Sequence, residues 1–161
     1  MIRKAKVDDY GVMAEIHNRS ISVLCRNHYS AEFISAWVSN PKIEKYRKRE
    51  QSGCEFYVYV CDNRIAGFVS VNWQECLLEG LFVDPDFSGR GVASELVNFV
   101  FDMADKNAND HFYVESSLNA VGFYRKAGFV EYGKGYFNVA EAAETESILM
   151  KANIKHQNSR C

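Results

Sequence analysis

The sequence lacks the features that mark membrane, secreted and metal-binding proteins. No apolar run approaches the ~20 residues that a membrane-spanning helix needs. The five cysteines are odd in number and include no Cys-x-x-Cys pair, and the first residues show no secretory signal pattern. The four histidines have no zinc-type spacing with the cysteines. These absences predict reduced thiols, a cytoplasmic location and no metal site.

The chain also lacks a strong charge of either sign. Lys and Arg number 19 against 21 acidic residues, so a formal charge of -2 creates no field that attracts a polyanion. The most basic stretch, 42–49, includes Ile43 and Tyr46 and is typical of a solvated helix face. We therefore expect neither a nucleic-acid partner nor a membrane partner.

The length of 161 residues and the hydrophobic content of 47% are those of one globular domain. We expect a single domain over 1–154 and a flexible tail over 155–161. Apolar periodicity and capping residues predict helices that begin near Asp8, Ser30, Lys42, Val92 and Asn119. The predicted strands cover 2–7, 55–61, 65–73, 77–83, 111–115, 129–136 and 144–150.

A glycine-rich turn joins the strand that ends at Val83 to the longest predicted helix. The first N–H groups of a helix have no internal partner, and the helix dipole adds about half a positive charge, so a phosphate is stabilised there. Gly89 and Gly91 remove side chains that would keep a pyrophosphate from the backbone, and Arg90 adds a cation. The spacing fits neither a dinucleotide fingerprint nor a P-loop, which indicates another kind of phosphate loop.

Two segments that flank this helix carry recognisable motifs. Ser88-Gly-Arg-Gly-Val-Ala93 matches Gln/Arg-x-x-Gly-x-Gly/Ala at Gly91 and Ala93 and departs from it at Ser88. Ser117-Leu-Asn-Ala-Val-Gly-Phe-Tyr-Arg-Lys-Ala-Gly-Phe129 matches Asn/Ser-x-x-Ala-x-x-Phe-Tyr-x-Lys-x-Gly-Phe. Together they resemble the GNAT superfamily of N-acetyltransferases. The stretch from His28 to Trp37 is further similar to a bacterial group of these enzymes, the YafP type.

The resemblance implies an α/β (α+β) fold with a mixed, mostly antiparallel sheet of about six or seven strands. Helices flank the sheet, and a splayed strand pair forms the coenzyme cleft. Acetyl coenzyme A is the implied cosubstrate, without a metal. Main-chain amides near Phe82 and Val83 would contact the thioester. The other implied coenzyme-binding residues are Ser88, Gly89, Arg90, Gly91, Val92, Ala93, Ser117, Asn119 and Tyr124.

Acetylation of an amine also needs a base and an acid. An alkylammonium with a pKa near ~10.4 must lose a proton, directly or through water. Glu79, on the strand before the glycine turn, is the candidate base, and Glu75 or a water relay is the alternative. By resemblance, Tyr124 protonates the departing thiolate. His28, Tyr29 and Trp37 are candidate walls of the acceptor pocket.

The sequence therefore predicts transfer of an acetyl group from acetyl coenzyme A to an amine of a small molecule, by direct attack in a ternary complex. A module that senses acyl coenzyme A without turnover is one alternative. Acetylation of a protein N-terminus or lysine is another. A homodimer is expected only by analogy with the family.

Overall fold

The computed structural model describes residues 1–39, 41–138 and 144–154. Within these residues seven strands form one sheet in the order β1-β2-β3-β4-β5-β7-β6. Every neighbouring pair of strands described is antiparallel except β4 and β5, which are parallel. The strands are β1 Ile2–Lys4, β2 Cys54–Cys61, β3 Arg64–Asn72, β4 Leu77–Val83, β5 His111–Ser116, β6 Val130–Asn138 and β7 Glu144–Asn153. This confirms the expected mixed, mostly antiparallel fold; the predicted tail, 155–161, lies outside the described residues.

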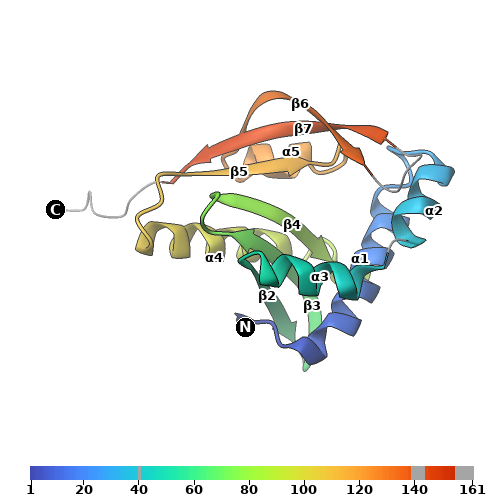
Figure 1. The fold of residues 1–161 in the computed structure, drawn as a ribbon, viewed down its shortest axis with the longest axis horizontal. Helices are drawn as coiled ribbons and strands as arrows, with labels where there is room; N and C mark the ends of the chain where they lie inside the picture. Colours follow the sequence, from blue (N-terminus) through green and yellow to red (C-terminus); the bar gives the residue numbers. More distant parts are fainter. Residues whose placement is uncertain (40, 139–143, 155–161) are drawn as a thin grey trace.

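Helices cover both faces of the sheet, because alternate residues of its strands point to opposite sides. Phe56 and Val58 of β2 pack with the helices of the first third of the chain, whereas Tyr57 packs with α4. In Figure 1, α3 lies in front of β2 and β3, and α4 lies behind β4. The helices are α1 Tyr10–Leu24, α2 Ala31–Ser39, α3 Lys42–Gln51, α4 Val92–Lys106 and α5 Val121–Lys126, with short 3-10 turns at Val7–Asp9 and Pro85–Phe87.

Of the helix caps that the sequence predicted, the one at α2 is correct and the one at α1 is wrong. Ser30 accepts a hydrogen bond from the backbone N–H of Phe33 at 3.1 Å and so caps α2, as expected. The expected cap of the first helix by Asp8 is wrong, because the 3-10 turn moves the start of α1 to Tyr10. Asp9 precedes α1 and instead accepts from the backbone N–H of Lys6 at 2.7 Å.

The sheet opens between β4 and β5. Among the described residues these strands pair only at Leu77 with Tyr113 and Leu78 with Val114. The register of β4 against β3 shifts at the same place, since Leu78 and Gly80 face consecutive residues of β3, which makes Glu79 a bulge. A bulge bends its strand and increases the local twist. The rest of β4 therefore turns away from β5, and the predicted splayed pair is present.

Candidate active site

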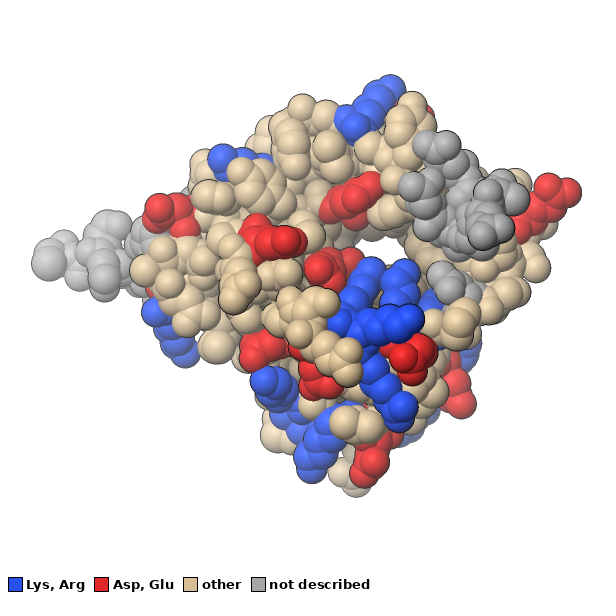
Figure 2. Space-filling model, viewed as in Figure 1, with Lys and Arg blue, Asp and Glu red and all other residues tan. Residues whose placement is uncertain are grey.

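A cavity of about 510 Å³ lies where β4 and β5 diverge, and it is lined from both faces of the sheet. On the side of α4 the lining comes from segments 87–94 and 117–124, here called the α4 side. On the other side it comes from α1, α2, α3 and β4 and includes His17, Lys45, Arg49 and Glu79, here called the α3 side. Figure 2 shows an opening through the molecule with basic and acidic side chains at its edge.

The glycine turn on the α4 side has a backbone that only glycine adopts easily. Gly89 and Gly91 have φ angles of +76° and +81°, and a Cβ added at either would meet nothing within 4 Å. Gly91 is the N-cap of α4, and its carbonyl accepts from Glu95 N–H at 3.0 Å. Residues 92–94, whose N–H groups precede this first helical bond, line the cavity. Open space thus faces a row of main-chain donors at the positive end of a helix.

An ion pair from α1 holds the start of this turn. Arg19 donates to both carboxylate oxygens of Asp84, at 2.8 and 2.9 Å, and Asp84 is only 4% exposed. Arg19 also bonds to Asp86 at 3.2 Å, and Asp84 accepts from the Asp86 N–H. Charge-assisted bonds of this kind are stronger than neutral ones. The turn is therefore fixed to α1, a contact between distant segments that the sequence pattern did not indicate.

Arg90 is the one predicted residue of this turn that does not appear in the described cavity lining. Its side chain is exposed, and its guanidinium lies over the ring of Phe87 at 5.3 Å from the centroid. A guanidinium over an aromatic face is an attractive cation–π contact. Ser88, Gly89, Gly91, Val92 and Ala93 all line the cavity, together with Phe82 and Val83 of β4.

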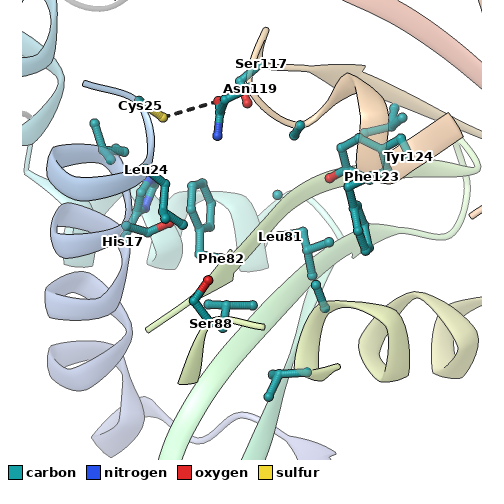
Figure 3. Close-up of a pocket in the computed structure, with 18 of the residues that line it drawn as sticks. His17, Leu24, Cys25, Leu81, Phe82, Ser88, Ser117, Asn119, Phe123 and Tyr124 are labelled. Atoms are coloured by element: carbon teal, nitrogen blue, oxygen red, sulfur yellow. Dashed lines mark hydrogen bonds between the residues drawn. The ribbon is translucent and has the colours of Figure 1, made fainter. Parts of the chain in front are cut away.

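The second predicted segment also lies in the wall. Ser117, Asn119 and Tyr124 line the cavity. The side-chain oxygen of Asn119 accepts from the Cys25 thiol at 3.4 Å, which leaves the amide nitrogen toward the cavity (Figure 3). Behind them, the Tyr29 hydroxyl accepts from Leu118 N–H at 2.8 Å. Both partners of the segment come from the chain between α1 and α2.

Tyr124 is buried at the centre of this wall, with 5% of its surface exposed. Its ring packs edge-on against Phe123 and Phe129, at centroid distances of 5.3 and 5.4 Å. Its hydroxyl points into the cavity (Figure 3) and makes no hydrogen bond to any residue that the structure describes. Burial raises the pKa of the Tyr124 phenol. A neutral O–H donor therefore faces the cavity well above neutral pH.

Glu79, at the bulge, contributes a carboxylate from the α3 side. It is half-buried, and its Oε2 lies 3.7 Å from Nη1 of Arg49. That same oxygen is buried and has no hydrogen-bond partner among the described residues. Glu75 is exposed in the turn before β4, where its N–H donates to the Asn72 side chain at 3.1 Å, and it does not line the cavity. Of the two candidate bases, only Glu79 lies in the cavity wall.

These positions agree with the comparison that decides the family. A family model described as the acetyltransferase (GNAT) domain matches residues 25–139, which is most of the chain. The chain belongs to the GNAT family. The expected resemblance and the expected fold are both confirmed, and the matched range includes both motifs.

GNAT relatives match at the level of sequence and of structure. The uncharacterised N-acetyltransferase YafP from Escherichia coli is 29% identical over 129 residues, which cover 80% of this chain and 79% of YafP. A GCN5-related N-acetyltransferase from Rhodopseudomonas palustris has 25% identity and a TM-score of 0.87, covering 95% of this chain and 94% of that one. The PaiA N-acetyltransferase from Thermoplasma acidophilum, solved with coenzyme A, has 21% identity and a TM-score of 0.74, covering 95% and 98%.

The predicted acceptor walls are only partly present in this GNAT cavity. Trp37 lines it and packs against the ring of Phe137 at 5.9 Å. His28 is exposed and Tyr29 is 8% exposed, and neither is among the described lining residues. Tyr29 is instead stacked on Phe33 at 5.2 Å, with its hydroxyl on Leu118. It therefore supports the segment behind Asn119.

The GNAT cavity also contains one imidazole and three charged side chains that the sequence did not indicate as site residues: His17, Lys45, Arg49 and Glu115. Glu115 follows Val114, the last residue of β5 that pairs with β4, so it stands beside the fork as Glu79 does on β4. It accepts a bond from Ser147 Oγ at 2.5 Å. The sequence does show an acidic residue near the end of a predicted strand. Its position at the fork becomes evident only when the pairing register of β4 and β5 is known.

His17 was considered only as a metal ligand. It is 7% exposed, with Nδ1 at 2.8 Å from the Tyr46 hydroxyl and its ring 3.8 Å from that of Phe82. Burial is the main cause that lowers the pKa of His17 well below its usual value, so the ring is neutral at pH 7. In Figure 3 it lies across Phe82 from Tyr124.

The basic stretch 42–49 is not a uniformly solvated face. Arg47 and Lys48 are exposed as expected, whereas Lys42 is 4% exposed and Lys45 and Arg49 are half-buried in the cavity wall. Long basic side chains bury their stems while the charged end stays polar, which charge patterns alone do not reveal. Among the described residues no His, Cys, Asp and Glu cluster suits a metal ion, and no helix there is long and apolar enough to cross a membrane.

Proposed function

We propose that this GNAT protein transfers the acetyl group of acetyl coenzyme A to an amine of a small molecule by direct attack in a ternary complex. One cavity that reaches both faces of the sheet at the β4–β5 fork carries this proposal. Main-chain donors line its α4 side, and ionisable side chains line its α3 side. Two reactants that enter from opposite faces meet at the fork, which is where direct transfer needs them.

The residues of the α4 side fit coenzyme A. Space beside Gly89 and Gly91 is open to a pyrophosphate, and residues 92–94, whose N–H groups belong to the first turn of α4, line the same cavity. Asn119 presents its amide nitrogen from the opposite wall. Ser88 and Ser117 add hydroxyl groups to the same wall. When bound, the coenzyme supplies an acetyl group activated as a thioester.

The protein's part of the reaction is proton transfer and charge stabilisation. Glu79 takes one proton from the acceptor ammonium, directly or through water, and so leaves a neutral amine that attacks the thioester; its carboxylate lies in the cavity wall. Main-chain donors near Phe82 and Val83 stabilise the charge that develops on the carbonyl oxygen. Tyr124 holds a proton at its hydroxyl and gives it to the leaving sulfur. As the C–N bond forms and the C–S bond breaks, the nitrogen loses a second proton, which replaces the one that Tyr124 gave to sulfur, directly or through water. The net reaction thus releases one proton, the one that Glu79 took.

Coenzyme binding and turnover test this function in two steps. Acetyl coenzyme A should raise the melting temperature of the protein, because a ligand that binds only the folded state stabilises it. A panel of small amines, peptides with free N-termini and lysine peptides is then followed by release of coenzyme thiol. Turnover of a small amine supports the proposal. Binding without turnover of any acceptor would favour a sensor, and turnover of peptides alone would favour a protein acetyltransferase. The absence of a thermal shift would refute coenzyme binding and with it the proposed transfer.

A further inference from the structure

The α3 side of the cavity carries two cations that the reaction itself does not require. Lys45 and Arg49 are four residues apart on α3, so their side chains leave the same face of the helix. Both are half-buried, and both line the cavity. In Figure 2 Lys and Arg side chains gather over α3 at the edge of the opening. An acetyl group and a plain amine offer these cations no counter-ion.

The acidic groups nearby do not balance this pair. Glu79 lies 3.7 Å from Arg49 and so offers a counter-charge to one of the two cations. No ion pair within 4.0 Å joins Lys45 to a residue in the described part of the chain. Burial lowers the pKa of Lys45, the neighbouring Arg49 lowers it further, and Glu79 opposes them. A desolvated cation beside another cation is stabilised when an anion enters.

The other acidic side chain of the wall, Glu115, comes from β5, whereas Lys45 and Arg49 come from α3. Glu115 follows the last paired residue of β5, so it flanks the fork where the sheet opens. Glu79 flanks the fork on β4 and also reaches toward Arg49. Both acidic side chains of the described wall thus belong to the two strands of the fork, and the Lys and Arg of this wall belong to α3. This polarity matches a molecule with an ammonium at one end and an anion at the other.

We propose that the acceptor is a primary amine that also carries a carboxylate, an amino-acid-like zwitterion. Lys45 and Arg49 bind its carboxylate, and Glu79 and Glu115 receive its ammonium at the fork. Arg and Lys are suited to this role because a guanidinium binds carboxylates through two parallel bonds and an ammonium adds a compact charge. This assignment rests on the proposed function and names the substrate class of the same site.

Matched acceptors test the assignment most directly. Each amino-carboxylate is compared with its carboxamide, which has the same size and no negative charge, at saturating acetyl coenzyme A. The carboxylate member should have kcat/KM at least about tenfold higher, because charge-assisted bonds contribute more than neutral ones. A carboxamide that is acetylated as well as its carboxylate partner would overturn the assignment, as would a preference for polyamines.

Variants of α3 locate the effect. Lys45→Met should raise KM for the carboxylate about tenfold and leave the carboxamide within about twofold, and Lys45→Arg should restore the preference. Lys48→Met, on the exposed face of the same helix, is the matched control and should change neither acceptor. Equal losses on both acceptors in Lys45→Met would show a merely structural role and overturn the assignment.

Binding readouts separate this inference from the proposed function. With coenzyme bound, acceptor dissociation constants measured by calorimetry should show the same tenfold preference even where turnover is slow. Lack of binding by every carboxylate would overturn the inference. Coenzyme binding with efficient acetylation of uncharged amines would leave the proposed function intact while refuting this substrate class. Failure of acetyl coenzyme A to bind at all would refute the proposed function first.

Discussion

The two sides of the cavity are built from different parts of the polypeptide. The α4 side uses main-chain N–H groups from one short segment, 88–94, supported by the segment 117–124. The α3 side uses side chains from α1, α3 and the bulged strand β4, which are far apart in the sequence. A main-chain site built from one short segment depends on local backbone conformation, so its residues form a recognisable sequence motif. A site assembled from distant side chains forms no such motif.

Gly91→Glu is the strongest way to break the main-chain side. The substitution places a carboxylate at the N-terminus of α4, where the added atoms enter the space proposed for a pyrophosphate. Like charges at close range cost several kcal/mol, so coenzyme affinity should fall at least about 100-fold. Isothermal titration of acetyl coenzyme A against the folded variant measures this effect.

Two glycine controls separate charge from backbone strain. Gly91→Ala keeps the strained φ angle without the carboxylate and should lose less affinity. Gly128→Ala has a comparable strain, with φ of +104°, outside the cavity lining, so it should lower the melting temperature and leave coenzyme affinity unchanged. Wild-type affinity in Gly91→Glu would refute the phosphate site.

Tyr124→Phe tests whether the α4 side also takes part in the chemistry. The variant keeps the packing against Phe123 and Phe129 and removes only the hydroxyl. Since general acids typically contribute 10²–10⁴-fold, kcat should fall by about 100-fold, while the coenzyme dissociation constant should rise by no more than about tenfold, the effect of losing one neutral hydrogen bond. Stopped-flow measurement of acetyl transfer and titration of the coenzyme check the two parts. An unchanged kcat would exclude the acid role.

The pH dependence sharpens the same test. Burial raises the pKa of Tyr124, so its acidic proton is retained at higher pH than that of a free phenol. The wild-type rate should therefore rise as the acceptor amine loses its proton and should not decline through loss of the Tyr124 proton up to about pH 10. A descending limb between pH 8 and 9 that disappears in Tyr124→Phe would contradict the direction of this shift.

The sequence predicted the α4 side better than the α3 side for a physical reason. The α4 side is determined by residues that are close in the sequence. These are the glycines of positive φ before α4 and the adjacent Phe123 and Tyr124 of α5. The bulge at Glu79 depends on pairing with β3, which no alternation pattern shows. The exposure of Lys45 depends on how α3 lies on the sheet, and a basic helix face looks the same whether it meets water or a cavity.

Glu79→Gln has the smallest expected effect and asks whether the α3 side does more than bind. The amide cannot take a proton, but water can replace part of the base's role, so kcat/KM should fall only about tenfold. Glu75→Gln is the matched control, since Glu75 is exposed in the turn before the same strand and should leave the rate unchanged.

The acceptor's own acidity decides how that tenfold loss is interpreted. An amine whose pKa lies below the assay pH arrives already neutral and needs no base. If Glu79 removes the proton, the defect of Glu79→Gln should therefore shrink toward onefold as the pKa of the acceptor falls, in a plot of kcat/KM ratios across a series of amines. If Glu79 only orients Arg49, to which it lies 3.7 Å, the defect should stay constant along the series. A constant defect would show that Glu79 positions Arg49 and does not transfer a proton. Glu79 would then belong, with Lys45 and Arg49, to the site that binds the acceptor.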